Sequence, residues 1–346
     1  MKKKSLNAKK KANKLILKHL ENSKVQKIYK IFHNNLDNNN RFSVALSGGP
    51  DSMALAFLAK CFSIINNLDI KFYLVDHKLR KESSKEAKVV ISVLKKFNIN
   101  CKILSWKGKK PTSNIQAIAR KKRYFLLSRQ CIKDKTNNLL LGHHLDDLRE
   151  NFLIRLLRGS GLKGLISFGE KTEYNRNGVI FLRPLINVEK RELTYISSKV
   201  FNFFIEDPSN VNENFKRIKI RNLLSVLEKQ GLDKKKFSLT ISNLKESDKS
   251  INFYVKNNLV KNSNFIKDRN ICLLNKDFFN QPNEIILRSI ILVMRSVSRK
   301  YYPARGKNVI NLIERIQADQ ITSKTTLGGC FIEKVNETIL ISNEND

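Results

Sequence analysis

Residues 42–59 read FSVALSGGPDSMALAFLA, and this stretch decides the fold of the first half of the chain. The apolar run Phe42–Leu46 predicts a strand, Ser47–Ser52 a tight turn, and residues 53–66 a helix. A strand, a glycine-rich turn and a helix in this order direct backbone N–H groups and the positive end of the helix toward an anion. The stretch therefore predicts a phosphate-binding loop in an α/β domain.

This loop combines glycines, hydroxyls and one acid. The glycines let the backbone approach an oxyanion closely, the two serines add hydroxyl donors, and proline suits the first turn of a helix. The acid would repel a bare phosphate, so its presence favours a Mg²⁺-nucleotide. The spacing fits neither a Walker A loop nor the Gly-x-Gly-x-x-Gly fingerprint. We expect six nucleotide-binding residues here, with Asp51 as the metal ligand: Ser47, Gly48, Gly49, Pro50, Asp51 and Ser52.

The composition indicates a polyanionic partner. Lys and Arg number 66 against 31 Asp and Glu, a net charge of +35 over 346 residues, which favours nucleic acid. The basic start of the chain lacks the apolar core of a signal peptide, and no apolar run reaches membrane-spanning length. We therefore expect a cytoplasmic protein of two or three domains.

The five cysteines are scattered, and none forms a Cys-x-x-Cys pair. This pattern fits reduced thiols and weighs against a zinc ribbon, a disulfide framework or iron–sulfur chemistry. We expect buried structural thiols at Cys61, Cys101, Cys131, Cys272 and Cys330.

Apolar runs alternate with amphipathic ones up to about residue 210. Further strands are predicted at Ile70–Val75, Asn100–Leu104 and Asn138–Leu141, and further helices at 84–97, at 114–133 and from about Leu145. This βαβ series predicts a parallel sheet with helices on both faces. Ligands of such sheets lie beyond the carboxyl ends of the strands, so the motifs found there should share one site.

Two polar clusters follow this pattern. Residues 76–80 read DHKLR after the second strand, where His77 and Arg80 would reach an adenine or a phosphate. Taken alone, this cluster is better explained as a polar turn at the end of the strand. Arg123 lies in a basic helical segment beside an apolar run. Such a face is usually solvated, but an arginine that turns inward would stabilise charge on a transferring phosphate.

Residues 142–150 read GHHLDDLRE and form the second strong motif. On a helix, His143, Asp147 and Glu150 would share one stripe, and side chains of these types can bind a divalent ion. The helix dipole alone favours acids near a helix start. That alternative explains Asp146 and Asp147, but neither the histidine pair nor Glu150.

Together the motifs resemble tRNA(Ile)-lysidine synthetases of the N-type ATP pyrophosphatase superfamily. The resemblance covers residues 40–222, including Arg217 and Arg221 in an Arg-x-x-x-Arg stretch, while 302–305 and 326–330 resemble the family's C-terminal RNA-binding region. In chain order, the motifs that carry it are SGGPDS, DHKLR, ARKKRY, GHHLDD, RLLRGSG and EDPSN (206–210). The family commonly has Gln where this chain has Leu148 and Thr where it has Asn151, which puts the surroundings of the site in doubt but not the reaction class.

The resemblance implies ATP-dependent ligation of free lysine to the wobble cytidine of the CAU anticodon of tRNA(Ile), through an adenylated cytidine, with ATP and Mg²⁺ as cofactors. It implies that Arg123 offsets charge at the α-phosphate and that Asp147 and Glu150 receive the lysine ammonium. His143 would either take the amine proton or contact the phosphate, and both roles stay open. A homodimer is compatible with this resemblance. The implied catalytic residues are Asp51, Arg123, His143, Asp147 and Glu150, with His77 and Arg80 as further nucleotide contacts.

We expect four segments. They are a basic helical lead-in over 1–38, a Rossmann-like ATP pyrophosphatase domain over 39–213, a helical linker over 214–264, and a small mixed α/β tRNA-binding domain over 265–346. Within the last, helices are predicted near 282–298 and 307–317, and a hairpin around Gly328 and Gly329.

Three alternatives remain, and the third belongs to a different class of protein. A tRNA thiolase is disfavoured by the lack of paired cysteines, and a small-molecule amidotransferase or NAD synthetase by the charge. A non-catalytic RNA-binding relative is disfavoured because the acidic and histidine residues of the motifs are intact.

Overall fold

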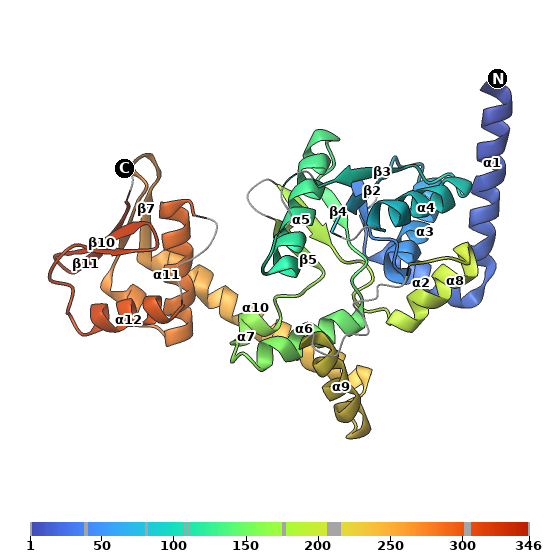
Figure 1. The fold of residues 1–346 in the computed structure, drawn as a ribbon. Helices are drawn as coiled ribbons and strands as arrows, with labels where there is room; N and C mark the ends of the chain where they lie inside the picture. Colours follow the sequence, from blue (N-terminus) through green and yellow to red (C-terminus); the bar gives the residue numbers. More distant parts are fainter. Residues whose placement is uncertain are drawn as a thin grey trace. The chain divides into compact units, whose positions relative to one another are not determined.

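The computed structural model describes residues 2–37, 41–79, 82–106, 108, 111–174, 178–205, 216–300 and 306–344. The chain divides into two compact units, Met1–Asp233 and Lys234–Asp346 (Figure 1). The division falls within the segment expected as a helical linker. Helix α9 (Lys216–Lys229) belongs to the N-terminal unit and helix α10 (Lys234–Asn262) to the C-terminal unit.

A six-stranded sheet in the order β3-β2-β1-β4-β6-β5 forms the centre of the N-terminal unit. Neighbouring strands are parallel except β5 and β6, which form an antiparallel hairpin at one edge. The first four strands confirm the predicted parallel sheet, and the hairpin is an addition to it. The strands are β1 Phe42–Leu46, β2 Lys71–Asp76, β3 Cys101–Ser105, β4 Asn138–Leu140, β5 Lys171–Tyr174 and β6 Val179–Leu182.

Helices cover both faces of this sheet. Their bounds are α1 Lys2–Lys18, α2 Ser23–Asn34, α3 Pro50–Ile65, α4 Ser83–Lys96, α5 Ile115–Lys133, α6 Leu145–Leu156, α7 Leu162–Leu165 and α8 Lys190–Phe201. Figure 1 shows α3 and α4 on one side of the sheet and α5 on the other. None of the described helices is long and apolar enough to cross a membrane.

Alternate residues of a strand pack into two separate hydrophobic cores, because successive side chains point to opposite faces of the sheet. In β1, Phe42, Val44 and Leu46 join the larger apolar cluster, which also takes in buried residues of α2, α3, α4 and α8. Ala45 packs against the smaller cluster, to which α5 contributes Leu127. Burial on both faces explains why the β1 sequence is apolar almost throughout.

Helix α3 begins three residues earlier than predicted. Pro50 occupies its first turn, where a missing N–H costs nothing, and Gly49 precedes it with extended backbone. The loop therefore runs directly into the helix, and the residues expected to bind the nucleotide include the helix start.

The C-terminal unit has its own sheet and core. The sheet is antiparallel in the order β7-β8-β11-β10-β9, and α11 packs on it. The predicted helices and the hairpin are confirmed, since Gly328 and Gly329 join β9 to β10 with φ values of +63° and +87°. The elements are β7 Ser263–Ile266, β8 Ile271–Leu274, α11 Asn283–Ser298, α12 Gly306–Gln317, β9 Thr325–Leu327, β10 Cys330–Val335 and β11 Thr338–Asn343.

Four of the five cysteines are buried as expected, and Cys101 is partly exposed. Burial raises the pKa of the Cys101 thiol to about 12 and those of Cys272 and Cys330 to about 11. These thiols stay protonated near neutral pH, which does not suit a nucleophile or a thiolate ligand.

Candidate active site

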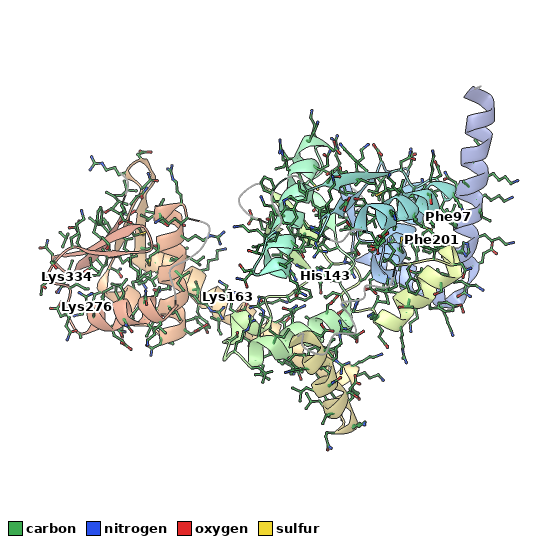
Figure 2. The ribbon with its side chains drawn as sticks, in the orientation of Figure 1. Phe97, His143, Lys163, Phe201, Lys276 and Lys334 are labelled. Atoms are coloured by element: carbon green, nitrogen blue, oxygen red, sulfur yellow. The ribbon has the colours of Figure 1, made fainter. Side chains whose placement is uncertain are left out.

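The glycine-rich loop and the 142–150 motif meet beyond the carboxyl ends of β1 and β4. These strands are neighbours, and the strand order reverses between them, which is where open α/β sheets bind their ligands. Gly142 lies so close to the loop that a Cβ there would stand 3.2 Å from the Asp51 backbone. His143, in the segment between β4 and α6, is labelled in Figure 2. The structure thus brings the two strongest sequence motifs into one site.

The loop is held by the hydroxyl of Ser52. This oxygen accepts the backbone N–H groups of Ser47 at 3.2 Å and Gly48 at 3.1 Å, and donates to the carbonyl of Gly49 at 3.0 Å. Ser52 is therefore the centre of the turn rather than a free donor. Gly48 has a φ of +86°, and a Cβ there would meet the Val90 side chain at 2.7 Å, so the turn requires glycine at this position.

Asp51 has one carboxylate oxygen available for a ligand. Its Oδ1 atom is buried and has no hydrogen-bond partner, whereas Oδ2 lies 3.6 Å from Nε2 of His144. A buried carboxylate oxygen without a donor suits a divalent cation. The described residues contain no group of three His, Cys, Asp or Glu side chains able to hold a metal ion. A cation at Asp51 would therefore need ligands from outside the described side chains, such as phosphate oxygens or water, to complete its coordination.

His144 is the site residue to which the sequence reasoning gave no role. It is buried at the start of α6, where its backbone N–H donates to Oδ2 of Asp147 at 3.1 Å. Its ring lies 3.5 to 3.7 Å from the carboxylates of Asp51, Asp146 and Asp147. Burial alone would lower the pKa of His144, but the hydrogen bond to Asp51 and the three carboxylate charges outweigh it, and the pKa is raised. The histidine pair in the motif was the available clue.

His143 does not lie on the helical stripe predicted for it. Helix α6 begins at Leu145, so only Asp147 and Glu150 of that stripe are helical. The His143 ring packs edge-on against Phe168 with centroids 5.1 Å apart, and its Nδ1 accepts a hydrogen bond from Nε of Arg183 at 3.2 Å. Burial, then the charges of Arg183 and nearby arginines, lower its pKa well below the usual value. The ring is therefore neutral near pH 7.

Arg123 of α5 is partly buried, and its Nε atom is buried. Its charge contributes to lowering the pKa of both His77 and His143. His77 lies edge-on to Trp106 with centroids 6.2 Å apart, and burial together with Arg123 lowers its pKa to about 4. Arg80 lies outside the described residues. The burial of Nε favours an inward orientation of Arg123 over a fully solvated helix face, and its action on the phosphate stays a prediction.

Glu150 is buried in an ion pair. Its Oε1 atom lies 2.6 Å from Nε of Arg221 on α9, and the Glu150 side chain is only 3% exposed against 39% for Arg221. Its Oε2 atom is buried without a hydrogen-bond partner. The resemblance drew attention to Arg221, but the sequence gave no reason to pair it with Glu150, 71 residues away.

Packing between α6 and α9 fixes this pair. Leu153 of α6 and Ile220 and Leu224 of α9 form a small buried cluster, and Arg149 lies 2.5 Å from Glu228. Of the two positions that depart from the family pattern, Leu148 is buried and Asn151 is partly buried. The motif at 206–210 and the one at 302–305 lie outside the described residues, as does the side chain of Arg217.

Comparison with known proteins identifies the domain and its fold. A family model for the PP-loop domain matches residues 20–227. A U34-tRNA thiolase from Methanococcus maripaludis has a similar fold, with a TM-score of 0.55 at 19% identity, covering 64% of this chain and 78% of that one.

Two curated relatives are similar over most of the chain. The tRNA(Ile)-lysidine synthase of Wolbachia pipientis wMel is 35% identical over 309 residues, which is 89% of this chain and 71% of the relative. That of Orientia tsutsugamushi (strain Boryong) is 32% identical over 318 residues, covering 89% and 70%. The chain therefore belongs to the tRNA(Ile)-lysidine synthase family.

Proposed function

We propose that this ATP-dependent ligase forms lysidine on tRNA(Ile) in two steps at the junction of β1 and β4. The observation that supports this assignment most directly is the contact between the loop at Asp51 and the segment 142–150, because it joins a phosphate-binding turn to buried carboxylates. The substrates are ATP, tRNA(Ile) with a CAU anticodon, and free lysine.

In the first step, the 2-carbonyl oxygen of the wobble cytidine attacks the α-phosphorus of ATP. An oxygen–phosphorus bond forms, the bond to the β-phosphate breaks, and pyrophosphate leaves. Asp51 would hold Mg²⁺ through its unpartnered Oδ1, and the cation would neutralise charge on the leaving pyrophosphate. Arg123 would face the α-phosphate, where a fixed cation stabilises developing charge. His143 would either contact that phosphate or take the amine proton in the second step.

In the second step, the ε-amine of lysine attacks C2 of the adenylated cytidine. A carbon–nitrogen bond forms, the carbon–oxygen bond breaks, and AMP leaves with the former carbonyl oxygen. The lysine arrives as an ammonium, which needs carboxylate neighbours. Glu150 suits this role because its Oε2 is buried and unpartnered, and Asp147 lies on the same side of α6.

The experiment is to incubate the protein with total tRNA, ATP and labelled lysine, and to follow both pyrophosphate release and label in tRNA. We expect label in a single isoleucine isoacceptor, and pyrophosphate release that requires tRNA. Pyrophosphate release without lysine transfer, or label spread over many tRNAs, would contradict the assignment. A thiolase reaction is disfavoured because the thiols that the structure describes have raised pKa values.

A further inference from the structure

Arg183 is a buried arginine that sits at the site without belonging to any motif identified in the sequence. It follows β6 directly, and its side chain is about 5% exposed. Parallel pairing of β4 with β6 places it beside the segment that begins at Leu141, since Leu141 N–H donates to the carbonyl of Leu182 at 2.9 Å. The sheet register therefore brings Arg183 next to His143.

The guanidinium is held in one orientation. Its Nη1 donates to the Gly169 carbonyl at 2.8 Å and to the Thr172 hydroxyl at 2.9 Å, and its Cζ atom lies over the Phe168 ring, 4.6 Å from the ring centre. The remaining bond runs from Nε to Nδ1 of His143 at 3.2 Å. Phe168 also packs against the His143 ring, so Arg183 and His143 both contact the same aromatic side chain.

The direction of this hydrogen bond determines which ring nitrogen of His143 carries a hydrogen. An arginine side chain donates and never accepts, so Nδ1 of His143 must carry a lone pair. Burial and the surrounding charges keep the ring neutral; these charges belong to Arg183, Arg120, Arg123 and His144. A neutral imidazole with a bare Nδ1 carries its hydrogen on Nε2. The free edge of the ring is then a donor, with no lone pair for an incoming proton.

We propose that Arg183 is a positioning residue that holds His143 as the Nε2–H tautomer, so that His143 donates a hydrogen bond to a phosphate oxygen during adenylation and does not serve as the base for lysine. This rests on the proposed function and decides between the two roles that the sequence left open for His143. It leaves Asp147 and Glu150 as the groups beside the lysine that can take the amine proton.

A purely structural role for Arg183 is the competing explanation. Its bonds to Gly169 and Thr172 tie the β5–β6 hairpin to the sheet, and that tie alone would favour a buried arginine. The two explanations differ in what they predict for the His143 ring, because only the positioning role fixes its tautomer.

The test is nitrogen NMR of the full chain labelled with ¹⁵N-histidine and free of substrates. The chain has five histidines, and His143→Gln identifies the His143 signals. We expect Nδ1 without hydrogen and Nε2 with it in the unaltered protein, across pH 6 to 8. Arg183→Met should give a mixture of tautomers, and Arg183→Lys should restore the original one. Thr172→Val, which removes a structural bond of Arg183 only, should leave the tautomer unchanged.

Kinetics supply the second readout. Pyrophosphate release should fall several-fold in Arg183→Met and acquire a new ionisation between pH 6 and 8, while His143→Gln, which keeps an N–H donor, should retain more activity than His143→Ala. Hydrogen on Nδ1 in the unaltered protein would overturn the proposal even if Arg183→Met failed to fold. An unchanged tautomer and an unchanged pH profile in folded Arg183→Met would show that Arg183 has only a structural role. The NMR measurement needs no substrate, so its result is independent of whether the protein transfers lysine.

Discussion

At the scale of single residues, the site balances buried charge in pairs. Asp51 faces His144, Glu150 faces Arg221, and in each case one carboxylate oxygen is left buried without a protein donor. An unsatisfied buried carboxylate oxygen is costly, so we expect ligands to complete both. The two oxygens correspond to the proposed positions of the metal and of the lysine ammonium.

Replacing Asp51 by Asn should stop adenylation without preventing tRNA binding. The amide keeps the size of the side chain and removes the charge that would hold Mg²⁺, so we expect pyrophosphate release to fall by about 10²-fold or more. Pyrophosphate assays and tRNA filter binding measure the two effects. Asp69→Asn is the control, since Asp69 is exposed. Release near the original rate would rule out the metal role.

Glu150→Gln should weaken the use of lysine more than that of ATP. Losing a charge-assisted hydrogen bond costs about 1.5–3 kcal/mol, so the KM for lysine should rise about 10- to 100-fold. Glu228→Gln breaks the other ion pair between α6 and α9 and serves as the matched control. Equal changes in the KM values for lysine and ATP would show that Glu150 does not contact lysine.

The free energy of unfolding should fall in mild acid, partly through His77. Its pKa is about 4 in the folded chain, because of burial and Arg123, against about 6.5 when unfolded. Between these values the unfolded state binds more protons, so stability decreases as pH drops. Urea unfolding of His77→Gln between pH 7 and pH 5 should therefore show a shallower decline than the unaltered chain. Equal declines in the two proteins would show that a group other than His77 is responsible for the loss of stability.

Sequence reasoning identified several charged residues of the candidate site, but neither Arg183 nor the way these residues pair. Asp51, Arg123, Asp147 and Glu150 stand in motifs with a chemical rationale, so they were predictable one by one. The contacts of His144 with Asp51 and of Arg221 with Glu150 depend on how distant segments fold together. No local spacing encodes such contacts.

At the scale of elements, three of the predicted strands, β1, β2 and β4, are buried almost throughout, whereas β3 is a partly exposed edge strand. The sequence analysis did not predict β6, although its residues VIFL are apolar and mostly buried. The sequence of β5 reads KTEY and is mostly exposed, so neither an apolar run nor an apolar alternation marks it. It is an edge strand whose place depends on pairing with β6, which a single-segment pattern does not reveal.

The packing of α9 on α6 can be tested directly. Leu224 is buried at this contact, whereas the adjacent Leu223 is 37% exposed. Leu224→Ala should therefore lower the free energy of unfolding by about 2–5 kcal/mol and also raise the KM for lysine, because α9 carries Arg221. Urea denaturation and lysine titration measure both. Leu223→Ala is the matched control and should change little; equal effects of the two variants would contradict the packing described.

At the scale of the whole molecule, the positive charge is concentrated in the N-terminal unit. Residues 234–346 carry 19 Lys and Arg against 11 Asp and Glu, a net charge of +8, which leaves +27 for residues 1–233. The C-terminal unit, proposed to bind tRNA, therefore supplies a minor part of the charge. We expect it to contribute specific contacts with distant parts of the tRNA more than non-specific electrostatic attraction.

A fragment ending at Asp233 separates these contributions, because it keeps α9 intact and ends where the two units divide. We expect a soluble fragment with unchanged ATP affinity, weaker tRNA binding and a shallower salt dependence. Each lost phosphate contact removes roughly 0.7–0.9 from the logarithmic salt slope, and most of the slope should remain. Calorimetry with ATP and tRNA binding at several salt concentrations provide the data.

Two results would change this view. Aggregation with loss of ATP binding would show that the C-terminal unit covers an apolar face of the first. Unchanged tRNA affinity and slope would place the RNA site wholly on the N-terminal unit.

The hydroxyl of Ser52 gives ATP a loop that is already ordered. Fixing a flexible backbone costs about 1–2 kcal/mol per residue in conformational entropy, and a turn that formed only around its ligand would subtract this cost from the affinity. Here one oxygen already gathers the N–H groups of Ser47 and Gly48. We expect phosphate oxygens to replace that single acceptor when the nucleotide binds. The conformational entropy of the loop has then already been lost at folding, and binding exchanges one oxygen acceptor for another.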